Sequence, residues 1–276
     1  MLIRDIFIKK SDISRTDLVN IIAFALSMSK EELFINAGVE ICNGERNKIE
    51  QLVEMRQRGI PLAYILKEKE FFSEKFFVDE RVLIPRPETE TLVEEALKLI
   101  GTRRDRLLLL DVGTGAGTIG LTIAKKTMQR VVCLDISLDA LAVAKKNAML
   151  LDVDEKVCFV CSDLLAGFRE GAGFDMILVN LPYIASGEWG SSMPDVRDFE
   201  PHIALDGGEG GIEIYRRLMM ALPHHLKKGG SVLCEIGSAA QAEDIRNALI
   251  CLGLRVETKP DLSGRKRVVI GTCINL

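Results

Sequence analysis

The sequence contains few aromatic residues and no excess of basic ones. Phenylalanine, tryptophan and tyrosine make up 5% of the 276 residues, so we expect a core that is mostly aliphatic. Lysine and arginine number 36, against 40 aspartate and glutamate residues. A protein that wraps duplex nucleic acid usually carries a clear excess of positive charge. We therefore expect no direct contact with nucleic acid.

The sequence also lacks long apolar runs. No run approaches the roughly 18 residues that are needed to cross a bilayer. The N-terminus is interrupted by Arg4 and Asp5 and has no apolar core of the kind found in secretory signals. These absences predict a cytoplasmic protein with no membrane attachment.

Cysteine usage fits a reducing compartment. The seven cysteines are an odd number, and most stand in apolar stretches. We therefore expect reduced thiols that are mostly buried, without a disulfide framework. Cys158 and Cys161 have the spacing of half a zinc site, but no second pair accompanies them. The sequence thus predicts two buried strand cysteines there and no metal.

The first quarter of the sequence has the pattern of a small helical bundle. Apolar residues recur at helical spacing between residues 16 and 28, and a further helix is expected over residues 44–58. Between them, Ser29 and Glu32 stand three residues apart, as in a capping box. We assign residues 1–69 to a helical domain, which leaves a second and larger domain in a chain of this length.

Residues 70–87 change character. The segment EFFSEKFFVDERVLI has two aromatic or β-branched runs on either side of Asp79 and Glu80, followed by two prolines. This pattern predicts a β-hairpin that turns at Asp79 and Glu80 and links the helical domain to the rest of the chain.

Residues 88–276 alternate between helical and strand patterns. Helices separate the first six expected strands, whereas the last two are joined too closely for a helix, so we expect the final strand to be antiparallel. The pattern predicts a seven-stranded, doubly wound, Rossmann-like α/β domain. The expected strands span residues 107–112, 130–135, 156–161, 174–180, 230–236, 253–259 and 266–273.

A glycine-rich segment, DVGTGAG, follows the first of these strands and precedes a helix. An open α/β sheet binds nucleotide-like ligands at this position. Gly115, Gly117 and Gly120 also satisfy the dinucleotide pattern G-x-G-x-x-G, so a nicotinamide cofactor stays open. Asp135 ends the second strand, where a carboxylate can accept both ribose hydroxyls. Asp111 is expected near the ligand, where its charge disfavours a pyrophosphate and favours the cationic end of S-adenosylmethionine.

A second motif follows the fourth strand. Asn180 ends this strand on the same side of the sheet, and Leu181, Pro182 and Tyr183 come next. The Asn180 side-chain oxygen and the Leu181 carbonyl offer two acceptors for the two N–H bonds of a planar amide or an exocyclic amine. The motif therefore indicates a binding site for a planar amide or an exocyclic amine.

These segments together identify a resemblance. The chain resembles the release-factor glutamine N5-methyltransferases over nearly its whole length, and the element IPRPETE behind a helical N-terminal domain is the most specific part of that likeness. The matching segments are GIPLAYILKEKEFFS (59–73), RVLIPRPETE (81–90), DVGTGAGTIGLTIA (111–124), LDISLDALAVAKKNA (134–148), FDMILVNLPYI (174–184), EPHIALDGGEGGIEIYRRL (200–218) and RKRVVIG (265–271).

The resemblance implies an enzyme that uses S-adenosylmethionine to methylate the glutamine side-chain nitrogen in the Gly-Gly-Gln loop of peptide chain release factors. It implies that the helical domain helps to dock the release factor, and we expect the enzyme to be a monomer. Two positions depart from the family, since Leu181 replaces a proline and Leu164 stands where some members have an aromatic residue. The implied cofactor residues are Asp111, Gly113, Thr114, Gly115, Ala116, Gly117, Asp135, Asp163, Leu164 and Asn180. The implied catalytic residues, which hold the glutamine, are Asn180, Leu181, Pro182 and Tyr183.

Three other functions use parts of the same pattern. An amino-methyltransferase acting on adenine N6 in nucleic acid can use the same asparagine motif, but it predicts a basic, aromatic-rich face that the composition does not suggest. A nicotinamide-dependent dehydrogenase would use the glycine loop. A non-catalytic module would bind the cofactor and transfer no methyl group.

Overall fold

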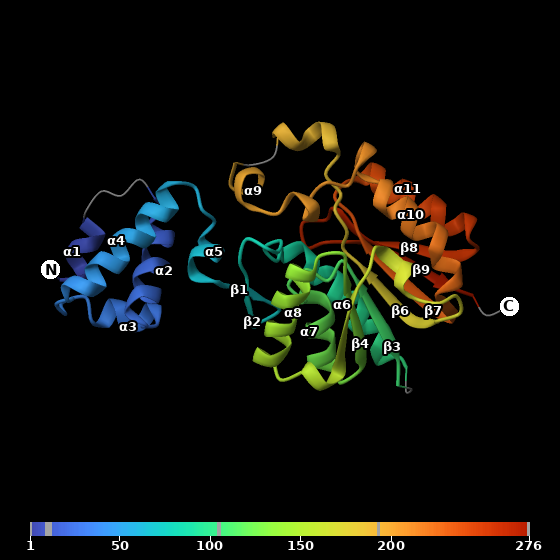
Figure 1. Cartoon of the computed structure of the whole chain (residues 1–276), viewed down its shortest axis with the longest axis horizontal. Helices are drawn as coiled ribbons and strands as arrows, with labels where there is room; N and C mark the ends of the chain where they lie inside the picture. The colour runs from blue at the N-terminus through green and yellow to red at the C-terminus, as the bar shows by residue number, and fades with distance from the viewer. Residues whose placement is uncertain (1, 9–12, 104–105, 192–193, 275–276) are drawn as a thin grey trace. The chain divides into compact units, whose positions relative to one another are not determined.

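The computed structural model describes residues 2–8, 13–103, 106–191 and 194–274. They belong to two compact units (Figure 1). One consists of Met1–Glu68 with Met193–Phe199, and the other of Lys69–Ser192 with Glu200–Leu276. Within the described ranges, no helix is long and apolar enough to cross a membrane.

The first unit is helical, as expected. The capping box at Ser29 and Glu32 is confirmed, because the Ser29 hydroxyl accepts from the Glu32 N–H at 3.1 Å and the Glu32 carboxylate accepts from the Ser29 N–H at 2.8 Å. Isoleucine and leucine side chains from several of the helices form its core. The helices are α1 (Ile3–Ile8), α2 (Arg15–Leu26), α3 (Lys30–Ile35), α4 (Asn43–Gln57), α5 (Leu62–Leu66) and α9 (Pro194–Phe199).

A hairpin is present, but the predicted position of its turn was wrong. Strands β1 (Glu68–Phe71) and β2 (Glu74–Phe77) pair, and the chain turns at Phe72 and Ser73, whose φ angles are 51° and 62°. Two successive positive φ angles suit a two-residue hairpin turn. The Glu90 carboxylate accepts from the Phe72 N–H at 2.8 Å and stabilises the turn. The residues around Asp79 therefore lie beyond the hairpin, within the second unit.

The second unit is built on a seven-stranded sheet of order β5-β4-β3-β6-β7-β9-β8. The pairs from β5 to β7 are parallel, and β9 is antiparallel to both of its neighbours, as the short last connection predicted. Each expected strand is present within a few residues, which confirms the fold class. The strands are β3 (Leu108–Val112), β4 (Arg130–Asp135), β5 (Val157–Cys161), β6 (Phe174–Val179), β7 (Leu226–Glu235), β8 (Leu254–Pro260) and β9 (Lys266–Cys273).

Helices cover both faces of this sheet (Figure 1). Side chains alternate along each strand, so that Leu109 enters one hydrophobic cluster and Leu110 the other. The first cluster contains side chains of α6 (Glu90–Gly101), α7 (Thr118–Thr127) and α8 (Leu138–Leu150). The second contains side chains of α10 (Glu213–Ala221) and α11 (Ala239–Cys251). Short 3-10 turns include η1 (Pro87–Thr89), η3 (Leu164–Gly167) and η5 (His202–Ala204).

The expectation that the cysteines are mostly buried was wrong. Strand β5 lies at the edge of the sheet, so its side chains have no neighbouring strand on one side and remain accessible. Cys158 and Cys161 are both exposed, whereas Cys133 and Cys234, in the central strands β4 and β7, are buried. In the part of the chain that the structure describes, all seven thiols are free.

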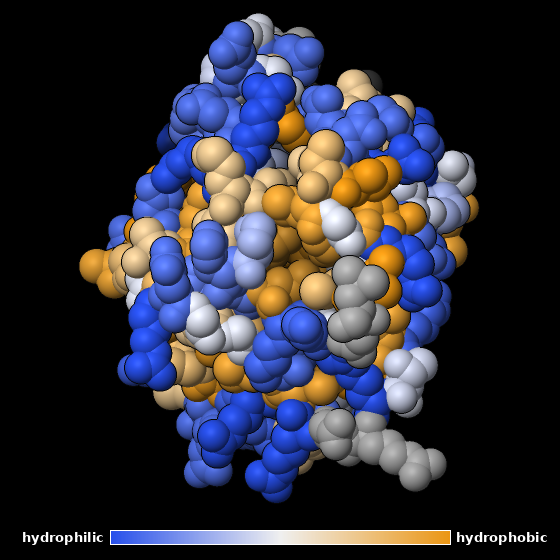
Figure 2. All heavy atoms as spheres, turned by 90° about the vertical axis from the view of Figure 1, so that its right-hand side faces the viewer, coloured by the Kyte–Doolittle hydropathy of each residue, from blue (hydrophilic) through white to orange (hydrophobic). Residues whose placement is uncertain are grey.

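Figure 2 shows one face of the molecule, where hydrophobic side chains gather in the middle and hydrophilic ones surround them.

Candidate functional site

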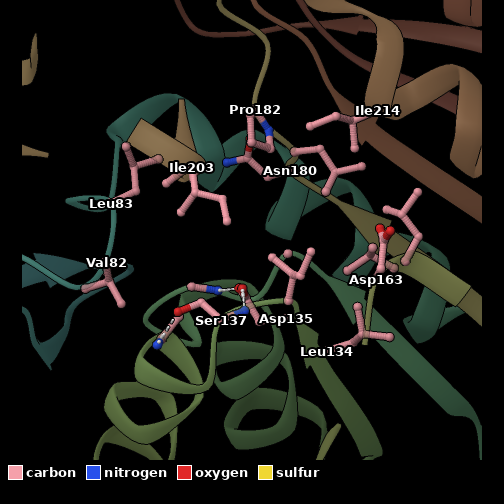
Figure 3. Close-up of a pocket in the computed structure, with 18 of the residues that line it drawn as sticks. Val82, Leu83, Leu134, Asp135, Ser137, Asp163, Asn180, Pro182, Ile203 and Ile214 are labelled. Atoms are coloured by element: carbon pink, nitrogen blue, oxygen red, sulfur yellow. Dashed lines mark hydrogen bonds between the residues drawn. The ribbon is translucent and has the colours of Figure 1, made fainter. Parts of the chain in front are cut away.

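A cavity of about 170 Å³ opens beside the carboxyl ends of β3, β4 and β6. Ligands of open α/β sheets bind at this edge. Figure 3 shows Asn180 and Pro182 on one side of the cavity and Asp135 and Ser137 on the other. Its lining is mostly apolar and comprises Arg81, Val82, Leu83, Val112, Gly113, Gly115, Leu134, Asp135, Ile136, Ser137, Ala140, Ser162, Asp163, Leu164, Asn180, Leu181, Pro182, Ile203, Ala204, Ile214 and Arg217.

The glycine loop between β3 and α7 forms one wall of the cavity. Gly115 has a φ of +55°, and a Cβ added there would meet no atom within 4 Å, so the backbone is open at this point. Gly117 has a φ of +86°, and an added Cβ would lie 2.6 Å from Cδ1 of Leu121. Gly115 thus leaves room for a ligand, while Gly117 allows α7 to pack closely behind the loop.

Asp111 lies behind this loop and does not line the cavity, which differs from its expected place beside the ligand. It is fully buried. Its Oδ2 accepts from the Thr114 hydroxyl at 2.6 Å and from the Gly120 N–H at 2.9 Å, while Oδ1 has no partner among the described residues. Burial raises the pKa of Asp111 to about 6, against the effect of these two donors. Asp111 therefore stabilises the conformation of the glycine loop through its hydrogen bonds with Thr114 and Gly120.

Asp135 does line the cavity, as expected from its place at the end of β4. One oxygen accepts from the Gly115 N–H and the other from the Ser137 N–H, each at 2.9 Å (Figure 3). Burial raises the pKa of Asp135, and backbone hydrogen bonds oppose that effect. Because each carboxylate oxygen carries a second lone pair, the side chain can still accept from ligand hydroxyls.

Asn180 is oriented by a residue of the IPRPETE segment. Its Nδ2 donates to Oγ1 of Thr89 at 3.3 Å, and Thr89 is itself buried. Its Oδ1 has no partner within the described ranges and is available as an acceptor. The side chain therefore presents an acceptor at the edge of an apolar cavity, as the motif predicted.

The residues after Asn180 are fixed by hydrogen bonds from α10 and α11. The Leu181 N–H donates to the Tyr215 hydroxyl at 3.2 Å, and this hydroxyl donates to the Glu235 carbonyl at 2.6 Å. The Tyr183 carbonyl accepts from Nε2 of Gln241 at 2.8 Å. A proline at position 181 would have no N–H to donate, so Leu181 makes an anchoring hydrogen bond that a proline at this position could not make.

The structure brings together eight of the expected site residues and leaves five outside the lining. Those that line the cavity are Gly113, Gly115, Asp135, Asp163, Leu164, Asn180, Leu181 and Pro182. Those that do not line it are Asp111, Thr114, Ala116, Gly117 and Tyr183.

Several lining residues were missed from the sequence. Ser137 could have been found, since it caps α8 immediately after Asp135. Ile203 belongs to η5, and no periodic pattern marks it. Arg217 was also missed. It pairs with the Asp163 carboxylate at 2.6 Å across an exposed part of the rim.

The chain preceding η1 is held against the cavity by one buried acid. The Glu200 carboxylate accepts from the Ile84 N–H at 3.1 Å and pairs with the Arg86 guanidinium at 2.5 Å. These bonds explain why Val82 and Leu83 lie at the rim (Figure 3). Among the described residues, no group of histidine, cysteine or acidic side chains is arranged to hold a metal ion.

Each of the two units contains a segment that matches a known protein family. Residues 6–66 match the family described as PrmC N-terminal domain, and residues 89–193 match the family described as Methyltransferase small domain. A solved methyltransferase structure from Pyrococcus furiosus is 20% identical, with a TM-score of 0.56, and the match covers 80% of this chain and 98% of that one. It supports the fold alone.

Curated relatives are closer in sequence. A release factor glutamine methyltransferase from Koribacter versatilis is 39% identical over 252 residues, which cover 91% of this chain and 88% of the relative. One from Clostridium acetobutylicum is 38% identical over 256 residues, with the same coverage. These names favour methylation of glutamine over methylation of adenine. The chain belongs to the release factor glutamine methyltransferase family.

Proposed function

We propose that the protein transfers a methyl group from S-adenosylmethionine to the side-chain nitrogen of the glutamine in the Gly-Gly-Gln loop of peptide chain release factors. The observation that carries this proposal is Asn180. Its Nδ2 is held by Thr89, and its Oδ1 is available at the edge of an apolar cavity. An amide acceptor placed in this way suits an N–H donor from a substrate.

The cavity fits the cofactor. The backbone is open at Gly115, where a side chain would otherwise occupy the space, and Asp135 offers acceptors at the opposite edge from Asn180. Apolar side chains such as Leu164 and Ile203 suit the flat faces of an adenine ring. When bound, S-adenosylmethionine supplies an electrophilic methyl group. Asp135 would hold its ribose, and Asp163 and Leu164 would flank its base.

An amide nitrogen is a poor nucleophile because its lone pair is delocalised into the carbonyl. Asn180 Oδ1 and the Leu181 carbonyl would accept the two N–H bonds of the glutamine and fix the nitrogen in the cavity. These acceptors also stabilise the positive charge that develops on nitrogen as it gains a methyl group and before it loses a proton. Tyr183, packed against Gly237, supports this wall.

The helical unit would help to dock the release factor. Its match to the PrmC N-terminal domain family supports this role, and Ile35, on α3, is 82% exposed. Exposed apolar side chains that gather in one place mark protein interfaces, and Phe34, Ile35 and Val39 are all exposed within six residues of one another.

The experiment is transfer of a labelled methyl group from S-adenosylmethionine to a purified release factor by the wild-type protein and by Asn180→Ala. We expect wild type to label the release factor. We expect the variant to lose turnover while it binds S-adenosylmethionine with nearly unchanged affinity, measured by calorimetry. Full turnover by Asn180→Ala would exclude the assigned role of Asn180.

A further inference from the structure

One buried acid joins two distant segments of the chain that both contribute to the cavity lining. The Glu200 side chain is 2% exposed. One carboxylate oxygen accepts from the Ile84 N–H at 3.1 Å, and the other pairs with the Arg86 guanidinium at 2.5 Å. A buried carboxylate is stable only where such donors compensate for its lost hydration, so these bonds hold both segments in one geometry.

The bond to Ile84 fixes the position of Leu83. The Ile84 N–H belongs to the peptide group that joins these two residues, and a peptide group is planar, with Cα of Leu83 in its plane. Ile84 is itself buried, whereas Leu83 is partly exposed and lines the cavity. By holding this peptide group, Glu200 therefore sets where the Leu83 side chain starts.

The same acid fixes one end of the segment that carries Ile203. Two residues separate Glu200 from Ile203, and the second of them begins the 3-10 turn η5. The other end is held as well, because the Leu205 carbonyl accepts from the Ile184 N–H at 3.0 Å. Ile203 thus lies on a short turn that is anchored on both sides. It lines the cavity and is 56% exposed.

We propose that Glu200 is a positioning residue that holds Leu83 and Ile203 in place as an apolar wall of the S-adenosylmethionine site. Figure 3 shows both side chains at the cavity. The inference rests on the proposed function, because it takes this cavity to be the site of that cofactor. Among the described residues that line the cavity, Glu200 is absent, so its effect passes through these two side chains.

An ordered wall raises affinity for a ligand. Leu83 and Ile203 both have exposed apolar surface that a bound ligand would cover, and this burial favours binding. Surface that is already in place stabilises the complex more than surface that must first be ordered, because ordering costs entropy. The loss of Glu200 should therefore weaken binding of the cofactor more than it slows the chemical step.

The test measures the dissociation constant of S-adenosylmethionine by calorimetry, with no release factor present, and then kcat and KM for methyl transfer to a release factor. The variant is Glu200→Gln. Glutamine keeps the size of the side chain but loses its charge, and its amide nitrogen cannot accept from Arg86. Thermal unfolding shows whether the variant is folded.

Asp175→Asn is the matched control. The Asp175 carboxylate also accepts from a backbone N–H, that of Leu108, at 2.9 Å, and it also pairs with a cation, Lys227, at 2.8 Å. It lies near the start of β6, at the opposite end of this strand from Asn180. This variant therefore loses the same kinds of interaction at a place away from the cavity.

We expect Glu200→Gln to raise the dissociation constant and KM of S-adenosylmethionine by about fivefold or more, since part of the ordered apolar contact is lost. At saturating S-adenosylmethionine, kcat should change by less than about twofold. Asp175→Asn should lower Tm and keep the wild-type dissociation constant. A wild-type dissociation constant in Glu200→Gln, or an equal rise in Asp175→Asn, would overturn the inference.

A double-mutant cycle with Ile203→Ala tests whether Glu200 acts through the wall. Because Ile203→Ala removes most of one wall side chain, Glu200→Gln should raise the dissociation constant by a smaller factor in that background than in wild type. Equal factors would show that Glu200 acts elsewhere and would overturn the inference.

If Glu200→Gln does not fold, Glu200→Asp takes its place. Aspartate keeps the charge, but its shorter side chain cannot reach both partners, so the dissociation constant should rise in the same direction. A wild-type value in Glu200→Asp would then overturn the inference.

Failure of the proposed function gives a different result. A wild-type protein that does not bind S-adenosylmethionine would refute the proposed cofactor, and the positioning role would fall with it. A wild-type protein that binds S-adenosylmethionine but does not label a release factor would refute the proposed substrate alone. The dissociation constants of the variants would still decide the role of Glu200.

Discussion

Replacing Tyr215 by phenylalanine removes one hydroxyl that joins two buried backbone groups. The hydroxyl accepts from the Leu181 N–H at 3.2 Å and donates to the Glu235 carbonyl at 2.6 Å. The ring itself is 1% exposed, and phenylalanine fills the same space. Each buried polar group that loses its partner costs about 1–3 kcal/mol, so Tyr215→Phe should destabilise the second unit by about 2–6 kcal/mol.

Thermal unfolding followed by calorimetry measures this cost. A unit of this size loses about 2–4 °C in Tm for each kcal/mol, so a cost near the middle of that range lowers Tm by about 10 °C. Methyl transfer should also slow, because the Leu181 carbonyl follows an N–H that is no longer anchored.

A double-mutant cycle with Leu181→Pro tests whether the loss of stability comes from the hydrogen bond between the Leu181 N–H and the Tyr215 hydroxyl. Proline has no N–H, so Tyr215 makes one bond fewer in this background, and Tyr215→Phe should cost less there by about 1 kcal/mol or more. Equal costs in the two backgrounds would refute the reasoning that Tyr215 anchors Leu181. A Tm within about 1 °C of wild type for Tyr215→Phe alone would refute it as well.

Three further predictions concern other parts of the second unit. Asn147→Ala removes three hydrogen bonds that join α8 to β2 and to the glycine loop, so the free energy of unfolding, measured in urea, should fall by about 2–5 kcal/mol. A fall below about 1 kcal/mol would contradict this role of Asn147. Gly117→Ala places a Cβ 2.6 Å from Leu121 at a φ of +86°, so the glycine loop cannot keep its shape, and calorimetry should detect no binding of S-adenosylmethionine. Wild-type affinity in this variant would show that the loop tolerates the side chain. Burial raises the pKa of Glu235 in the folded state from 4.5 to about 7, so folding favours its protonated form, and the stability that this group contributes is lost as the pH rises through that range. Between pH 5 and pH 8, the free energy of unfolding should therefore fall less for Glu235→Gln than for wild type. Equal falls in the two proteins would refute the shift in pKa.

The sheet could be predicted from the sequence because each central strand is buried on both faces and therefore reads as a continuous apolar run. The position of the hairpin turn could not. Its residues, Phe72 and Ser73, are not typical of a two-residue turn, and the Glu90 carboxylate from α6 holds Phe72. Asp79 and Glu80 look more like turn residues, but local preference is overridden here by a contact from elsewhere in the chain.

The candidate site was predictable where a residue stands at the end of a strand. Asp135 and Asn180 both meet this condition, and both line the cavity. Residues brought in by long connections were not predictable, since Ile203 reaches the rim through a 3-10 turn with no periodic pattern. The hydrogen bond from Asn180 to Thr89 joins segments far apart in the sequence, and only the folded chain places them together.

The most direct test of the proposed function is to locate the methyl group. Wild-type protein is incubated with S-adenosylmethionine and a purified release factor, and the product is digested and sequenced by mass spectrometry. The account predicts one methyl group on the side-chain nitrogen of the Gly-Gly-Gln glutamine, and none when that glutamine is replaced. A methyl group on another residue, or equal labelling after the replacement, would contradict it.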